Sequence, residues 1–117
     1  MFRLQGESDS SKSKETKSYL NNFESFVSAV RNDLEVPNLP VVVSPVVWKG
    51  KYVHVVNQAL FQAGQGAVSN CVCIDELDAA VFGVQPAEAA LCAEHLTAAG
   101  VTDIGRRMGE AMPLSFE

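Results

Sequence analysis

The chain of 117 residues contains no apolar stretch approaching the ~20 residues that a membrane-spanning helix needs. Basic residues are few, nine against 14 acidic ones, and the resulting net charge of −5 argues against a protein that binds nucleic-acid phosphates. Three cysteines do not suggest a disulfide framework and indicate reduced thiols. No apolar signal segment follows Met1, so we expect a cytoplasmic location if the chain is complete and leave the location open otherwise.

The apolar residues are arranged in alternating strand and helix patterns. They make up 47% of the chain, which is enough for a core in one domain or in part of a larger one. The expected strands are residues 2–4, 39–48 and 68–74, and the expected helices are residues 19–34, 52–63 and 97–112. Residues 6–17 read as a polar loop. This alternation predicts parallel strands joined by crossover helices, and hence an α/β fold.

Two helices have apolar stripes that predict which side is buried. In the first helix the stripe consists of Tyr19, Phe23, Phe26, Val27, Val30 and Leu34. In the last helix it consists of Val101, Ile104, Met108 and Met112. Gly105 and Gly109, four residues apart on that last helix, are expected to let it pack closely on the sheet.

Functional groups in a parallel α/β layer gather where strands end and loops begin, and two such places carry polar residues. Gln5 and Gly6 directly follow the first strand, and an amide with a backbone N–H at that point suits an oxyanion. His95 precedes the last helix, next to Thr97 as a candidate N-cap. A histidine can accept a proton from a hydroxyl nucleophile if a carboxylate orients it. Spacing by itself leaves a polar turn and a capping or surface histidine as the alternatives.

The cysteines raise the question of a zinc site. Cys71 and Cys73, with Cys92 and His95, would supply four ligand atoms. The C-x-C spacing lies within a strand pattern, however, and neighbours two apart on a buried strand face favour two small core side chains. We therefore expect neither a metal nor an organic cofactor.

Two blocks of sequence resemble one family of hydrolases. Gln5-Gly6-Glu7-Ser8-Asp9 is followed by an aromatic helix and by Leu39-Pro40-Val41-Val42-Val43, and the chain closes with His95-Leu96-Thr97-Ala98-Ala99-Gly100 and Gly105-Arg106-Arg107-Met108. In order and spacing these resemble the sialate O-acetylesterase-like (SASA) domain of the SGNH hydrolases, which overlaps carbohydrate esterase family six. The resemblance covers nearly the whole chain. It implies a three-layer, flavodoxin-like parallel sheet that is incomplete at the N-terminus, with residues 1–117 as the C-terminal portion of one such domain.

The resemblance also implies roles for four residues. His95 would be the catalytic base, and Glu7 a partner carboxylate or a structural one. Gln5, with Gly6, would serve the oxyanion or line the pocket. The implied reaction removes an O-acetyl group from a sugar through a serine–histidine mechanism with an acyl-enzyme, so the implied partner is an acetylated carbohydrate.

The sequence departs from the family pattern at two points of the reaction. The nucleophilic serine of the family lies upstream of the QGESD block, in a part that this chain does not include. The aspartate usually found three residues before the histidine is Cys92 here, and a neutral thiol cannot hold an imidazolium as a carboxylate does. Glu7 and Glu94 remain as alternative carboxylates. The hydroxyls that the pattern allows near His95 are those of Ser8, Ser10, Ser44 and Thr97.

Whether the chain is an enzyme by itself therefore stays open at this point. The alternative to an acetylesterase is a catalytically inactive remnant or interaction domain that retains the scaffold. Missing upstream strands would leave an open sheet edge, and we expect self-association or a complementing chain at that edge. We expect no nucleic-acid or membrane partner.

Overall fold

The structure is a computed structural model that describes residues 1–3, 6, 13–46, 51–74 and 98–112. The described residues form a parallel sheet of three strands, β1 (Phe2–Arg3), β2 (Val41–Val43) and β3 (Cys71–Cys73). The strands lie in the sheet in the order β1-β2-β3, with Phe2 opposite Val42 and Val42 opposite Val72. The predicted α/β fold with parallel strands is confirmed.

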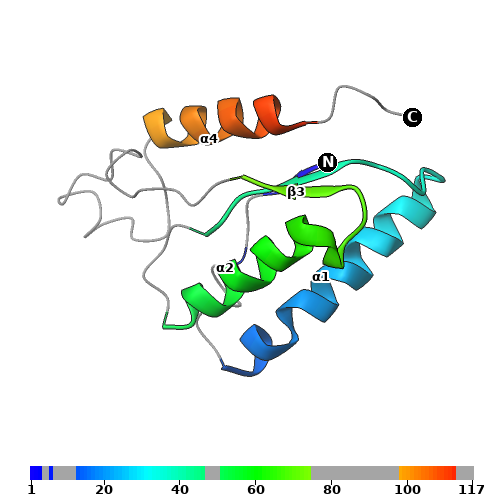
Figure 1. The fold of residues 1–117 in the computed structure, drawn as a ribbon, viewed down its shortest axis with the longest axis horizontal. Coiled ribbons are helices and arrows are strands. Elements are labelled where there is room, and N and C mark those ends of the chain that lie inside the picture. The colour runs from blue at the N-terminus through cyan, green and yellow to red at the C-terminus, as the bar shows by residue number, and fades with distance from the viewer. Residues whose placement is uncertain (4–5, 7–12, 47–50, 75–97, 113–117) are drawn as a thin grey trace.

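Helices cover both faces of this sheet. They are α1 (Ser13–Asp33), α2 (Val53–Gln62), which continues into the π-helical turn η2 (Ala63–Ala67), and α4 (Ala98–Ala111). Figure 1 shows α1 and α2 on one face and α4 alone on the other. The described part of the chain thus has three layers, with a single helix on the α4 face.

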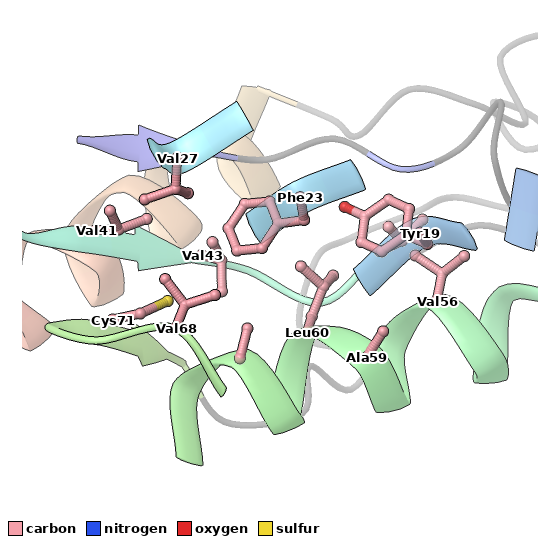
Figure 2. Packing of buried hydrophobic residues seen from close by; sticks show 12 residues of the cluster. Tyr19, Phe23, Val27, Val41, Val43, Val56, Ala59, Leu60, Val68 and Cys71 are labelled. Atoms are coloured by element: carbon pink, nitrogen blue, oxygen red, sulfur yellow. The ribbon is translucent and has the colours of Figure 1, made fainter. Parts of the chain in front are cut away.

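The main core lies between β2 and the pair α1 and α2 (Figure 2). Val41 and Val43 point into it, and Val42 between them faces α4 together with Ile74. Side chains of this kind contribute about 1.5–3 kcal/mol each when fully buried. Because β2 is covered on both faces, its unbroken run of valines is the pattern expected of a parallel strand in a three-layer fold.

The observed strands are shorter than the predicted ones. Residues 41–46 are all buried, but the ladder of β2 ends at Val43, and Pro45 has no N–H to continue it. The backbone N–H of Ser44 still donates to the carbonyl of Arg3, and burial between two helix layers produced the strand-like pattern over the residues beyond it. For the same reason β3 is confined to residues 71–73, although Val68 and Ile74 are also buried.

Helix α1 corrects the predicted loop over residues 6–17. It begins at Ser13, and the segment 14–17 that was expected to be loop contains Lys and Glu, which are good helix formers. The buried stripe is also narrower than predicted. Tyr19, Phe23 and Val27 are buried, whereas Phe26 is 40% and Leu34 is 59% exposed.

Two glycines, Gly64 and Gly66, lie in the turn that follows α2. Gly66 has φ +121°, a conformation that favours glycine. Gly64 lies against β3 so closely that a Cβ there would come within 2.6 Å of the backbone nitrogen of Cys73. The π-helical turn therefore packs directly on the sheet, and position 64 has no room for a side chain.

One side of helix α4 is more exposed than the sequence predicted. Ile104 and Met108 are buried against the sheet as expected, but Val101 is 53% exposed. The expected close packing of Gly105 and Gly109 is wrong, because a Cβ at either position would meet no atom within 4 Å. The stripe was misjudged because no described helix lies beside α4 on this face, so only the residues that point straight at the sheet are covered.

The amino ends of β2 and β3 are joined through Arg31, near the end of α1. Its Nε and Nη2 donate to the carbonyl of Leu39 at 3.2 and 2.8 Å, in the segment before β2. Its Nη1 and Nη2 donate to the hydroxyl and carbonyl of Ser69 at 3.1 and 2.6 Å, before β3. One guanidinium group on α1 thus bonds to two other parts of the fold, the segments before β2 and β3.

Replacement of Arg31 by alanine should lower the free energy of unfolding by about 2 kcal/mol, because its charge-assisted bonds to the carbonyls of Leu39 and Ser69 are lost. The measurement is urea unfolding followed by circular dichroism. The matched control is Arg106→Ala, which removes only exposed ion pairs with Asp103 and Glu110 and should cost less. Equal losses in the two variants would show that Arg31 does not link the strands.

Candidate functional site at the carboxyl edge of the sheet

Gly6 marks the carboxyl edge of β1, and its position has room only for glycine. The residue is buried and has φ +148°, a region that favours glycine. A Cβ there would lie 2.8 Å from Cγ2 of Val46 and 3.0 Å from Cγ1 of Val56. The backbone of Gly6 is thus held against the segment that follows β2 and against α2.

Tyr19 brings α1 to the same place. Its hydroxyl oxygen lies 3.3 Å from where a Cβ of Gly6 would be, and its ring lies parallel to that of Phe23, with centroids 6.4 Å apart. Figure 2 shows Tyr19 and Val56 together at one end of the core. The sequence predicted Tyr19 as a core residue and gave no sign that its polar atom reaches the candidate site.

Asn57 fixes the segment after β2. The backbone N–H of Val46 donates to Oδ1 of Asn57 at 2.7 Å, and Nδ2 of Asn57 donates to the carbonyl of Val46 at 3.0 Å. Both halves of the amide are therefore used to hold one residue at the edge of the sheet. Sequence reasoning missed Asn57, although an asparagine between the buried Val56 and Leu60 of one helix is a signal that could have been noticed.

Ser44 does not serve as a nucleophile in this arrangement. It is 1% exposed, and its hydroxyl donates to the carbonyl of Pro45 at 3.0 Å. A hydroxyl so placed is closed off from substrate. The other candidate hydroxyls, those of Ser8, Ser10 and Thr97, lie outside the described residues.

Three of the four predicted site residues also lie outside the described residues, namely Gln5, Glu7 and His95. The same holds for Cys92 and Glu94. Their mutual arrangement stays a prediction. Helix α4 begins at Ala98, three residues after His95 in the sequence. Its first turn lies on the side of the molecule where β3 ends (Figure 1).

The two cysteines of β3 are free thiols that pack in or against the core, Cys71 buried and Cys73 half-buried. Burial raises the pKa of the Cys71 thiol, and the nearby Arg31 guanidinium opposes that rise. Within residues 1–3, 6, 13–46, 51–74 and 98–112, no group of three or more His, Cys, Asp or Glu side chains is arranged to hold a metal ion. None of the helices described there is long and apolar enough to cross a bilayer.

A three-layer α/β protein with a crowded glycine at the carboxyl edge of its sheet has the arrangement that α/β enzymes and binding proteins use for their sites. The sequence model of the family described as "Carbohydrate esterase, sialic acid-specific acetylesterase" (SASA) matches residues 1–113. The chain belongs to this family of carbohydrate esterases.

One plant protein resembles the chain in both sequence and structure. A probable carbohydrate esterase from Arabidopsis thaliana is 37% identical over 71 residues, which are 61% of this chain and 26% of the relative. The X-ray structure of that Arabidopsis protein superimposes with a TM-score of 0.72 at 27% identity, over 94% of this chain and 41% of the other. The chain thus spans less than half the length of the relative that it matches.

Proposed function

We propose that this chain takes part in removing O-acetyl groups from a carbohydrate, as the C-terminal portion of an acetylesterase domain. The observation that carries the proposal is the position of Gly6. Its buried backbone lies at the carboxyl edge of the sheet, where α/β proteins place their chemistry, and Gln5 and Glu7 are its neighbours in the sequence. Membership of a carbohydrate esterase family supports the same reaction class.

In the proposed reaction a serine oxygen attacks the carbonyl carbon of the acetyl group, and His95 accepts the serine proton. The amide of Gln5 donates to the oxygen that gains negative charge, and the neighbouring Gly6 lies against Val46 and Val56. The bond to the sugar oxygen breaks, and that oxygen leaves with the proton from His95. Water then attacks the acetyl-serine, with His95 again as the base, and releases acetate.

The serine belongs, in this proposal, to the part of an esterase domain that the Arabidopsis relative has beyond the matched region. The 117 residues supply the base and the oxyanion donor, and Glu7 or Glu94 supplies the carboxylate in place of Cys92. Because an activated aryl ester can be attacked by water with the help of a general base, His95 can be tested in this chain without the serine.

The test is the turnover of p-nitrophenyl acetate by the 117-residue chain. We expect a rate above that of buffer, and a fall of roughly a hundredfold in the catalysed part for His95→Ala, the size typical of a lost general base. His54→Ala is the matched control, because His54 is the only other histidine and is exposed on α2. That variant should keep the original rate.

The second candidate is a scaffold without catalysis, an inactive remnant or interaction domain. Cys92, in place of the usual aspartate, is the observation that favours it. Equal rates for the unaltered chain, His95→Ala and His54→Ala would support this alternative and contradict an esterase role for His95.

A further inference from the structure

Helix α2 carries a second row of side chains beside the row that it buries in the core. Val53, Asn57 and Phe61 follow one another at intervals of four residues, on the flank next to the buried Leu60. All three side chains of this row are half-buried, and Gln58 beside them is exposed. The flank thus combines two apolar side chains, one of them aromatic, with two amides.

A pocket of about 330 Å³ lies on this flank. The lining that the structure describes consists of five α2 residues between Val53 and Phe61, and none of the five is Lys, Arg, Asp or Glu. Small-molecule sites typically begin at about this volume and combine apolar walls with a few polar groups. An uncharged lining with amides suits a neutral ligand that carries hydroxyl groups, and it offers no partner to a charged one.

Asn57 gives the pocket a polar group whose direction is fixed. Its Oδ1 accepts from the backbone N–H of Val46 at 2.7 Å, and its Nδ2 donates to the carbonyl of Val46 at 3.0 Å. An asparagine amide has two N–H groups and two oxygen lone pairs, so these two bonds leave one of each within the described part of the chain. A ligand that binds them meets an amide that is already held in place, which lowers the entropic cost of binding.

The same amide connects the pocket to the candidate site. Its partner Val46 lies against Gly6, where an added Cβ would come within 2.8 Å of Cγ2 of Val46. Helix α2 begins at Val53 on the carboxyl side of the sheet, as a helix that follows a parallel strand does. From Val53 to Phe61 the helix advances about 12 Å. The pocket therefore begins near the rim of the proposed chemistry and extends away from it along α2.

We propose that this pocket binds a neutral sugar unit of the carbohydrate that carries the acetyl ester. The ring of Phe61 would pack against the apolar face of the sugar, and the amides of Asn57 and Gln58 would bind its hydroxyl groups. Because the pocket lies beside Gly6 and not at it, the bound unit is a neighbour of the acetylated one. The substrate class is then a carbohydrate of at least two sugar units. This inference rests on the proposed function for the identity of its ligand.

The experiment titrates the 117-residue chain with cellobiose, lactose and maltose, three neutral disaccharides without an acetyl group, and follows ¹H–¹⁵N NMR spectra. We expect at least one of them to shift the side-chain amide signals of Asn57 and Gln58 together with backbone signals of α2. Phe61→Leu keeps an apolar side chain and removes the ring, and it should raise Kd roughly tenfold. Gln58→Ala should raise Kd roughly fivefold, because one hydrogen bond to the sugar is lost.

Gln62→Ala is the matched control and should leave Kd unchanged. Gln58 and Gln62 are both exposed on α2, four residues apart, and of the two only Gln58 lines the pocket. Both changes are at exposed helix positions where alanine is a good helix former, so this pair tests the pocket even if Phe61→Leu does not fold.

The inference is overturned if no disaccharide shifts the signals of residues 53–61, or if Gln58→Ala and Gln62→Ala change Kd equally. Because the probes carry no ester, binding and hydrolysis are measured separately. A chain that binds a disaccharide at α2 and does not hydrolyse p-nitrophenyl acetate would keep the pocket and count against the proposed function. A chain that hydrolyses the aryl ester through His95 and binds none of the disaccharides would count against the pocket alone.

Discussion

Replacement of Gly6 by alanine should lower the free energy of unfolding by about 3 kcal/mol. Two costs add at this position. The backbone, at φ +148°, adopts a conformation that residues with a Cβ rarely take, and the new Cβ would lie 2.8 Å from Val46 and 3.0 Å from Val56. Neither valine can move away easily, because both are buried. Urea unfolding monitored by circular dichroism measures the loss.

Gly66 provides the control that separates the two costs. It has φ +121°, and a Cβ there would meet no atom within 4 Å, so Gly66→Ala carries the conformational cost without the contact. Its loss should be about 1 kcal/mol. A further variant, Gly6→Ala combined with Val46→Ala, should be less destabilised than the two single variants added together, because the second change makes room for the first. If Gly6→Ala unfolded at the same urea concentration as the original chain, the tight packing around Gly6 would be disproved.

Replacement of Cys92 by aspartate should raise the His95-dependent rate on p-nitrophenyl acetate roughly tenfold to a hundredfold. The residue stands where the family has an aspartate, and a carboxylate there would orient the imidazole and stabilise its protonated form. Cys92→Asn is the control, since asparagine has the shape and hydrogen-bonding capacity of aspartate without the charge. The gain should appear with aspartate alone and disappear when His95→Ala is added.

The outcome also decides between the alternative carboxylates. If aspartate and asparagine at position 92 give the same rate as cysteine, then another carboxylate already supports His95. Glu7→Gln and Glu94→Gln, measured separately, would show which of the two it is by a fall in rate. A chain in which none of these changes affects the rate would be one in which His95 is not a base.

The order of strands and helices was predictable from the sequence, because short apolar runs rich in β-branched residues alternate with segments whose apolar residues recur every three to four positions. The ends of the strands and the width of the buried stripe on each helix were harder to predict. Val46 is buried like a strand residue but pairs with a side-chain amide, and burial is all that an apolar pattern reports. Phe26 and Val101 belong to their stripes by spacing and yet are exposed, since the sequence does not say how wide a surface each helix covers.

The sequence predicted where the candidate site lies but not the contacts that form it. Its motif put Gly6 after a strand, and in the structure Gly6 lies three residues beyond the end of β1, against Val46 and Val56. The reason for a glycine there comes from Val46 and Val56, which are distant in sequence, and no local pattern could have given it. The two hydrogen bonds between Asn57 and Val46 were missed for the same reason. They involve the backbone of Val46, and the residue type at a position does not show that its backbone binds a distant side chain.

The position of Arg31 has a consequence for how this fold can diversify. The guanidinium holds the starts of β2 and β3, while Gly6 and Val46 lie where the strands finish. The alignment of the strands therefore depends on contacts at their amino ends, whereas the proposed chemistry lies at the rim formed by their carboxyl ends. Apart from Gly6 and the Asn57–Val46 pair, residues at the carboxyl rim can then change in sequence while strand pairing is preserved.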